Sequence, residues 1–312
     1  MKPQKIAVIG SGAVGCFYGA VIQQAHPELE VHFLMRSDLE TVHRDGLIIQ
    51  SDERDDFTLQ PVRCAATTDE IGPVDLILIA LKTTDNAALD SMIPALLHDQ
   101  TAIVTLQNGL GNEDYLAQRF GAHRVLGALC FVCINRTAPG VIHHIAHGLI
   151  EMGEFSVIGE TERTTAIQSL FEKSGVPCVV RENLMQAKWR KLVWNVPFNG
   201  LSIAAGELDV ERILADPDLK IRVKSLMMEV IAAAAAFGIE IPEEFADQNI
   251  SRTEIMGPYL PSSLIDFSAG KPVETESIWG EPLRRGLEKG VAMPELEKLY
   301  AEIKVMVASR SK

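Results

Sequence analysis

Residues 5–15 read Lys5-Ile6-Ala7-Val8-Ile9-Gly10-Ser11-Gly12-Ala13-Val14-Gly15. The apolar run Ile6–Ile9 predicts a buried strand, and the residues after Gly12 predict the start of a helix. The first glycine allows a tight turn, the second lets backbone approach a pyrophosphate, and the third lets helix and strand pack closely. This order predicts a dinucleotide-binding βαβ unit. The residues expected to contact the cofactor are Gly10, Ser11, Gly12, Ala13, Val14 and Gly15.

The same alternation continues through the first half of the chain. Further Val/Ile/Leu runs, typical of parallel strands covered on both faces, occur at Val31–Leu34, Leu76–Leu81 and Ile103–Leu106. Helices are predicted between strands, for example at Val14–Gln24 and Ala87–Leu97. A strand-dense region follows at Val125–Cys133, Val141–His147 and Leu149–Met152, with a turn predicted at Gly148. The pattern favours a doubly wound sheet.

Beyond Arg181 the strands largely disappear. The helices predicted there are Asn183–Leu201, Leu219–Phe237, Pro242–Gly257, Leu260–Ser268, Thr275–Gly290 and Pro294–Ser309. The fold class is therefore α/β, with an N-terminal Rossmann-type doubly wound sheet followed by an all-α C-terminal domain. We expect the first domain to span residues 1–182 and the second 183–312, a division that suits a chain of 312 residues.

Composition narrows the choice of partners and compartment. The formal charge of −13 would repel a polyphosphate backbone, so nucleic acid is not an expected partner. Every apolar stretch is too short for a secretion signal or a membrane span. The five cysteines are odd in number and scattered, which does not suggest a disulfide framework and favours the cytoplasm. Cys130 and Cys133 lie in a predicted strand, and no metal site is expected.

Polar side chains follow three of the predicted strands. Arg36 comes after Val31–Leu34, where an NAD-binding protein is expected to carry Asp or Glu and an NADP-binding protein an Arg for the 2′-phosphate. Arg36 therefore predicts NADP(H), although a solvated surface arginine and a rival contact from Asp38 stay open. Lys82 and Asn108 follow the next two strands. Ligands of open sheets lie outside the carboxyl ends of strands, so both residues are predicted to contact the cofactor.

A polar stripe marks the first helix predicted in the second half. Lys191, Asn195 and Asn199 recur at every fourth position, which places them on one face of a helix. The residues around them are apolar. Because burial of an unpaired amide costs about 1–3 kcal/mol, the stripe must face water or line a cavity. The apolar flanks favour a cavity.

Several of these motifs are also found together in one family. They are Gly10-x-Gly12-x-x-Gly15, Lys82, Gln107-Asn108-Gly109-Leu110-Gly111, Trp189-Arg190-Lys191-Leu192-x-x-Asn195 and Pro261-Ser262-Ser263-Leu264-x-Asp266-x-x-x-Gly270-Lys271-Pro272-x-Glu274. In these motifs and their order the chain resembles the ketopantoate reductase (2-dehydropantoate 2-reductase) family. The resemblance implies a Rossmann domain followed by a helical domain like the C-terminal domain of 6-phosphogluconate dehydrogenase. It also implies reduction of 2-dehydropantoate to pantoate by NADPH, a step of pantothenate and coenzyme A biosynthesis.

The resemblance implies roles for single residues as well. Lys191 would donate the proton, while Asn195 and Asn199 would bind the substrate. Ser262 would contact the substrate carboxylate, and Glu274 would lie near both the nicotinamide ribose and the substrate. The chemistry agrees, because reduction of a ketone builds negative charge on oxygen that an ammonium can stabilise and then protonate.

Departures from the family pattern leave alternatives open. The family commonly follows the late glutamate with an Ile-Asp pair, whereas Thr275-Glu276 stands here, so Glu276 competes with Glu274. The stretch between Asn199 and Glu207 lacks an asparagine that some members use for the substrate. The expected partner is thus a small-molecule 2-oxo acid, and a homodimer is left open. The alternatives are a reductase of another 2-oxo acid and an NADPH-binding sensor without turnover.

Overall fold

The computed structural model describes residues 3–310. These residues form two compact units. One unit comprises the residues up to Gln107 together with Asn112–Leu184, and the other comprises Asn108–Gly111 together with the residues from Met185 onward. The segment Asn108–Gly111 thus belongs to the second unit, although the chain on both sides of it belongs to the first.

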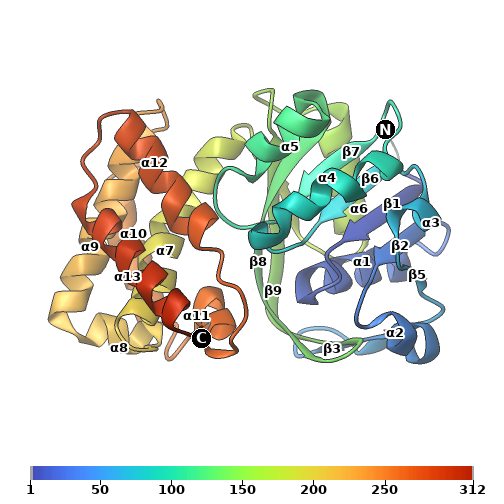
Figure 1. Cartoon of the computed structure of the whole chain (residues 1–312), viewed down its shortest axis with the longest axis horizontal. Helices are drawn as coiled ribbons and strands as arrows, with labels where there is room; N and C mark the ends of the chain where they lie inside the picture. Colours follow the sequence, from blue (N-terminus) through green and yellow to red (C-terminus); the bar gives the residue numbers. More distant parts are fainter. Residues whose placement is uncertain (1–2, 311–312) are drawn as a thin grey trace. The chain divides into compact units, whose positions relative to one another are not determined.

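All ten strands of the described residues lie in the first unit, in one sheet (Figure 1). The strands are β1 (Lys5–Ile9), β2 (Glu30–Leu34), β3 (Leu47–Ser51), β4 (Phe57–Leu59), β5 (Arg63–Ala65), β6 (Leu76–Ile79), β7 (Ala102–Thr105), β8 (Val125–Ala138), β9 (Val141–Glu154) and β10 (Cys178–Val180). The helices are α1 (Ala13–Ala25), α2 (Leu39–Asp45), α3 (Thr68–Ile71), α4 (Leu89–Met92), α5 (Asn112–Phe120) and α6 (Glu162–Lys173), with 3₁₀ turns at Thr83–Ala88, Pro94–Leu96 and Ala122–Arg124. The strand order is β4-β3-β9-β8-β7-β6-β1-β2-β5, and β10 pairs with β9.

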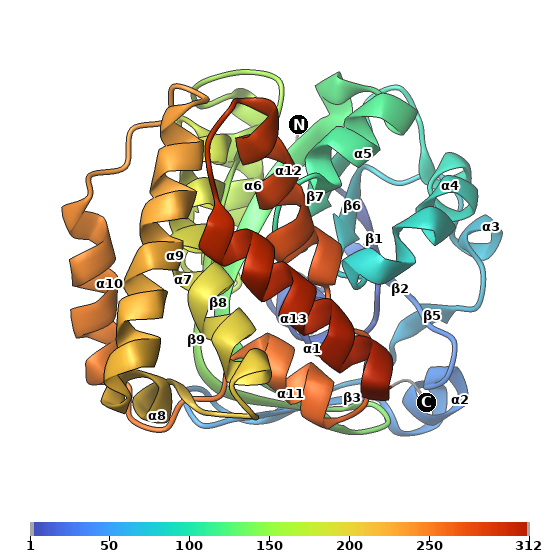
Figure 2. The same ribbon diagram turned by 60° about the vertical axis from the view of Figure 1, so that its left-hand side comes forward.

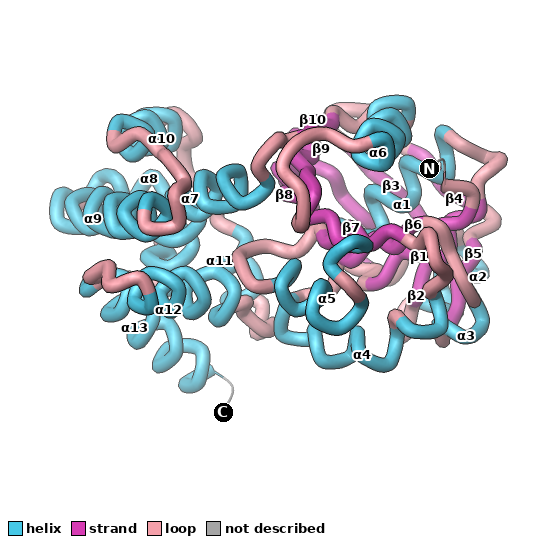
Figure 3. Tube along the Cα trace, turned by 90° about the horizontal axis from the view of Figure 1, so that it is seen from above, coloured by secondary structure: helices cyan, strands magenta, loops and turns pink. Residues whose placement is uncertain are grey.

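The sheet is covered by helices on both faces (Figure 3). In β1, Ile6 and Val8 share a buried core with α1 and α6. The alternate residues Ala7 and Ile9 share a second core with α3, α4 and α5. Successive strand side chains point to opposite faces, so a strand buried on both sides needs an unbroken apolar run. Strands β5, β2, β1, β6, β7 and β8 pair in parallel. The predicted Rossmann-type doubly wound sheet is confirmed.

The turn predicted at Gly148 is wrong. Strand β9 continues through it, antiparallel to β8, and opposite Gly148 the pairing shifts register between Phe131 and Val132. His147 and Gly148 have φ values of 68° and 138°. A bulge can accommodate positive φ and increase the local twist without ending the strand, which is why this glycine imitates a turn in the sequence.

The helix predicted at Ala87–Leu97 is interrupted. It is divided into the end of the Thr83–Ala88 turn, the four residues of α4 and the turn Pro94–Leu96. Pro94 lacks an N–H, and its ring crowds the carbonyl of the residue four positions earlier, so a continuous α-helix cannot pass through this position undisturbed.

The second unit contains helices and no strand among the described residues. They are α7 (Leu184–Ala204, of which Leu184 still belongs to the first unit), α8 (Val210–Ala215), α9 (Pro217–Ala235), α10 (Glu244–Glu254), α11 (Ser262–Ser268), α12 (Glu281–Glu288) and α13 (Pro294–Arg310), with a π-helical turn at Glu276–Gly280. Helix α9 packs against α10 and α13 (Figure 2). The all-α prediction for the second half is confirmed. Among residues 3–310, no helix combines the length and the apolar character needed to cross a membrane.

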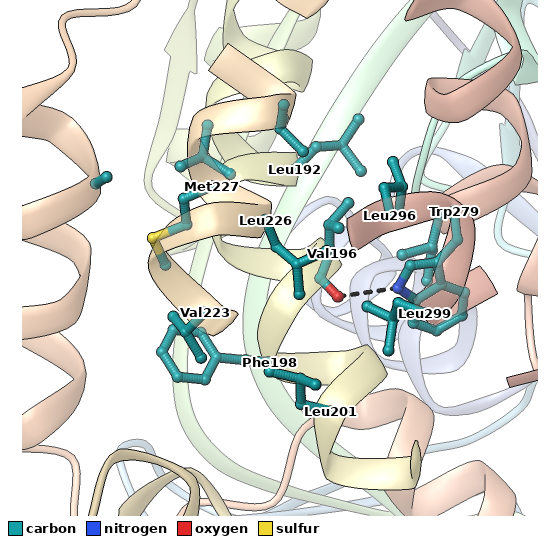
Figure 4. Close-up of a cluster of buried hydrophobic side chains, with 14 of the residues drawn as sticks. Leu192, Val196, Phe198, Leu201, Val223, Leu226, Met227, Trp279, Leu296 and Leu299 are labelled. Atoms are coloured by element: carbon teal, nitrogen blue, oxygen red, sulfur yellow. Dashed lines mark hydrogen bonds between the residues drawn. The ribbon is translucent and has the colours of Figure 1, made fainter. Parts of the chain in front are cut away.

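Helix α7 runs through the core of the second unit. Its Val196 lies among Leu226, Trp279 and other buried apolar side chains (Figure 4). The Trp279 indole Nε1 donates to the Val196 carbonyl at 2.9 Å, which ties the π-helical turn to α7. A Cβ at Gly200 would lie only 2.8 Å from the same Nε1, so a larger residue would disturb this packing. The polar stripe is therefore carried by a helix whose other faces are firmly packed.

Candidate active site

The glycine loop follows β1 directly and opens α1. Gly10 has φ +97°, and a Cβ there would lie 2.3 Å from Leu81 N. A Cβ on Gly15 would lie 2.2 Å from the Gly10 carbonyl oxygen. At Gly12, by contrast, a Cβ would meet nothing within 4 Å. The loop is thus packed against protein at its first and third glycines and open at its second, as the approach of a pyrophosphate requires.

The start of α1 suits an anion. Gly12 is the N-cap, no side chain among the described residues caps this end, and the first turn holds no acidic residue. Ala13 and Val14 are half-buried in that turn. The N–H groups of a first helical turn have no partner inside the helix, and the helix dipole favours negative charge there. These features fit the diphosphate of a dinucleotide.

The ends of three strands meet at this loop. Ser11 Oγ donates to the Leu34 carbonyl at 2.7 Å, which ties the loop to the end of β2. Ala80 N donates to the Ile9 carbonyl at 2.7 Å, which joins the ends of β6 and β1. Lys82 follows two residues later and is half-buried at the start of the Thr83–Ala88 turn. The first unit therefore brings the glycine loop close to the segments that carry Arg36 and Lys82.

Arg36 and Asp38 have very different surroundings. Arg36 is exposed, whereas Asp38 is buried. Oδ2 of Asp38 accepts from Arg136 Nη1 at 3.0 Å and from Gly140 N at 3.1 Å, and Oδ1 accepts from Ser37 Oγ at 2.8 Å. Most of the acceptor capacity of this carboxylate is thus filled by protein donors. Asp38 is poorly placed to compete for a ribose hydroxyl, and Arg36 is left as the accessible charge after β2.

In the second unit, α7 carries Lys191 half-buried. Its Nζ donates to Asn108 Oδ1 at 3.0 Å. Because Asn108 belongs to the Asn108–Gly111 segment, this contact lies within the second unit. An ammonium has three donors, and the amide oxygen sets the direction of one of them. The predicted proton donor and a predicted cofactor contact are therefore neighbours.

The two asparagines of the stripe differ. Asn195 is 8% exposed, and its side chain has no hydrogen-bond partner among the described residues. Asn199 is 2% exposed, and its Oδ1 accepts from Ser263 N at 3.0 Å, so it holds the first turn of α11. The Asn195 amide is therefore available for a hydrogen bond to a ligand, and its contact with the substrate stays a prediction. The substrate contact expected from Asn199 stays a prediction.

Lys188, for which no role was predicted from the sequence, lies one turn before Lys191. It is only 3% exposed, and its Nζ donates to the Gly109 carbonyl at 3.1 Å. A buried ammonium is strongly unfavourable unless it is hydrogen-bonded or paired. A lysine beside Trp189 in a largely apolar helix is the feature of the sequence that indicates burial of Lys188. The sequence does not indicate its partner, because the Gly109 carbonyl lies 79 residues away.

The late segment separates its two glutamates. Ser262 is exposed as the first residue of α11, and Glu274 is buried. Glu276 is exposed and accepts from Arg284 Nη1 at 2.9 Å and from the Tyr300 hydroxyl. Desolvation alone would raise the pKa of Glu276, but the hydrogen bonds from Tyr300 and Arg284 outweigh it and leave the pKa below its ordinary value. Glu276 thus belongs to a surface network, which favours Glu274 as the carboxylate of the site.

Two family models match the chain. The one described as ketopantoate reductase PanE/ApbA matches residues 6–156, and the one described as ketopantoate reductase PanE/ApbA C terminal matches residues 183–307. A 2-dehydropantoate 2-reductase from Nostoc sp. is 37% identical over 310 residues, which cover 98% of this chain and 96% of that protein.

Solved structures agree with these matches. The 2-dehydropantoate 2-reductase from Geobacter metallireducens is 41% identical with a TM-score of 0.92, covering 96% of this chain and 99% of that one. The enzyme of the same name from Methylococcus capsulatus is 36% identical with a TM-score of 0.91, covering 99% of this chain and 98% of that one. The likeness extends over nearly the whole length of each protein.

Proposed function

The chain belongs to the ketopantoate reductase family, and on that premise we propose that it reduces 2-dehydropantoate to pantoate with NADPH, with Lys191 as the proton donor. The observation that carries the proposal is the arrangement on α7. Lys191 Nζ lies 3.0 Å from Asn108 Oδ1, and Asn195, one turn later, is buried without a partner among residues 3–310. An oriented ammonium beside an available amide suits an anionic 2-oxo acid.

The proposed contacts with the cofactor are Gly10, Ser11, Gly12, Ala13, Val14, Gly15, Arg36, Lys82, Asn108 and Glu274. Arg36 would pair with the 2′-phosphate, because a guanidinium matches the geometry of phosphate and Asp38 is occupied by Arg136. When bound, NADPH supplies the hydride equivalent that reduces the ketone.

The helical residues would perform the remaining steps. Asn195, Asn199 and Ser262 would bind and orient the substrate. As negative charge develops on the ketone oxygen, the Lys191 ammonium would stabilise it and then donate a proton from Nζ. Asn108 would orient Nζ by accepting one of its hydrogen bonds.

Residues 1–182 would form the NADP-binding domain and residues 183–312 the helical domain for substrate and catalysis. The reaction would serve pantothenate and coenzyme A biosynthesis in the cytoplasm. The homodimer left open by the sequence stays a prediction, which light scattering of the purified protein tests.

NADPH oxidation by the purified protein, with ketopantoate as the sole acceptor, tests the proposal. Turnover is expected to be fastest with ketopantoate when 2-oxoisovalerate and 2-oxobutyrate are compared with it. Faster turnover of another acceptor would keep the reaction class and change the substrate. NADPH binding without oxidation by any of the three acceptors would favour a sensor.

A further inference from the structure

We propose that Lys188 is a positioning residue of this site, which acts through Gly109 on Asn108 and thereby on Lys191. The inference rests on the proposed function, because it explains how the proposed proton donor is oriented. The three contacts from which it is argued, Lys188 to Gly109, Leu110 to Ser277 and Lys191 to Asn108, lie within the second unit.

The peptide group between Gly109 and Leu110 is held from both sides. Its carbonyl oxygen accepts from Lys188 Nζ at 3.1 Å, and its N–H, on Leu110, donates to the Ser277 carbonyl at 2.9 Å. Gly109 has φ +82°, and a Cβ there would lie 2.2 Å from the Ser277 oxygen. The Leu110 side chain is buried in the core of the second unit. This peptide plane is thus fixed by two hydrogen bonds and by packing.

Packing alone does not require an ammonium at position 188. At 3% exposure, a methionine of similar length would fill the space without the desolvation penalty of a charge. What the lysine adds is a charge-assisted hydrogen bond to Gly109, and such bonds are stronger than neutral ones. Through this bond the Lys188 charge would restrain the backbone of the Asn108–Gly111 segment.

The restraint acts on the neighbouring residue. Asn108 is bonded directly to Gly109, so a fixed Gly109–Leu110 peptide limits how the Asn108 backbone can turn. Asn108 Oδ1 in turn accepts from Lys191 Nζ at 3.0 Å. Lys188 and Lys191 are three residues apart on α7, and residues at this spacing share a helix face. One turn of α7 thus contacts the Asn108–Gly111 segment twice. Lys188 binds the Gly109 carbonyl, and Lys191 binds the Asn108 side chain.

The substitution Lys188→Met tests the inference, since it keeps the length of the side chain and removes the donor. We expect kcat to fall by about tenfold or more, because a misplacement of about 1 Å can cost up to 10²-fold in rate. The Kd for NADPH, from its fluorescence, should stay within about twofold. Lys188→Arg, which keeps a charged donor, should retain more turnover than Lys188→Met. The control Lys224→Met removes an exposed lysine of α9 that pairs with Asp247, and should keep wild-type kcat.

A double-mutant comparison separates this role from general structural damage. If Lys188 acts through Asn108, then Lys188→Met should cost little further kcat in an Asn108→Ala background. Fully additive losses would overturn the inference, as would wild-type kcat in Lys188→Met.

Hydrogen exchange gives a readout that does not depend on turnover. In Lys188→Met, peptides covering residues 108–111 should exchange faster, while peptides from α9 should not change. Unchanged exchange at 108–111 would overturn the inference even if the protein reduced no ketopantoate. Failure of the wild type to oxidise NADPH with ketopantoate would count against the proposed function alone.

Discussion

The chemistry proposed here depends first on the surroundings of single side chains. Lys191 is half-buried, and its Nζ donates to an amide oxygen, Asn108 Oδ1, at 3.0 Å. Asn195 is buried, and its side chain has no hydrogen-bond partner among the described residues. Glu274 is buried, whereas Glu276 is exposed. A partly desolvated environment favours the reaction, because electrostatic stabilisation of a developing charge is stronger there than in bulk water.

Lys191→Ala should lower kcat by a factor on the order of 10² or more, since it removes the proton donor. Binding of NADPH should change little, because the glycine loop is untouched. Steady-state kinetics and a fluorescence titration measure the two effects. Lys220→Ala, which removes a partly exposed lysine paired with Glu254, serves as the matched control. Wild-type turnover in Lys191→Ala would remove this residue from the mechanism.

Glu274→Gln should lower turnover, whereas Glu276→Gln should lower only stability. Because the pKa of Glu276 lies below its ordinary value of 4.5, ionised Glu276 stabilises the fold above that pH, and the contribution disappears as the pH falls through the lowered pKa. The exposed Glu276–Arg284 pair is worth about 1 kcal/mol or less. Urea unfolding at neutral and acidic pH should therefore show a small deficit for Glu276→Gln at neutral pH only. Loss of turnover in Glu276→Gln alone would reverse the assignment.

At the scale of elements, different glycines of the β1–loop–α1 unit serve packing and proposed cofactor binding. Two of its glycines are enclosed by protein and one is open. Helix α7 makes a similar division, since its apolar residues lie in the core of the second unit and its polar stripe carries Lys191 and Asn195, the proposed site residues. In both elements, packed residues position neighbours that contribute little to packing.

Gly10→Ala and Gly12→Ala should therefore fail in different ways. Gly10→Ala forces a positive φ and a contact with Leu81, and the strained φ alone costs about 1–3 kcal/mol of unfolding free energy. Gly12→Ala should leave the Tm nearly unchanged but weaken NADPH binding on the order of tenfold, because its Cβ enters the approach to the backbone. Thermal unfolding and NADPH titration measure both effects. Unchanged NADPH affinity in Gly12→Ala would argue against a pyrophosphate at this loop.

At the scale of the whole molecule, the chain passes between its two units three times, around Asn108–Gly111 and again after Leu184. Each family model corresponds largely to one unit, and the likeness to solved relatives covers nearly the full length. A ligand that binds only the folded protein adds to the stability of the whole through mass action.

NADPH should stabilise the wild-type protein more than NADH does at equal concentration. At 100 times its Kd a ligand adds about 2.7 kcal/mol to the unfolding free energy, and a weaker ligand adds less. In Arg36→Asp the order should reverse, because a carboxylate repels the 2′-phosphate and accepts from a ribose hydroxyl. Thermal shift with each cofactor checks this. An unchanged order in Arg36→Asp would place the 2′-phosphate contact elsewhere.

Local pattern was sufficient for the fold class, and it also supplied the candidate residues of the site. These patterns are the apolar runs, the glycine triplet and the four-residue interval between Lys191 and Asn195. Each reflects preferences of residues within one helical turn or one strand, which a linear sequence displays directly. The bulge at Gly148 and the break at Pro94 were harder, because a glycine or proline marks an irregularity without stating its kind.

Only the tertiary structure decided which distant residues become partners. It joins Asp38 to Arg136, 98 residues away, places the Asn108–Gly111 segment in the helical unit, and buries Lys188 against Gly109. It also separates buried Glu274 from exposed Glu276. Such choices depend on how packed elements bring far parts of the chain within hydrogen-bond reach, and no local propensity encodes that distance.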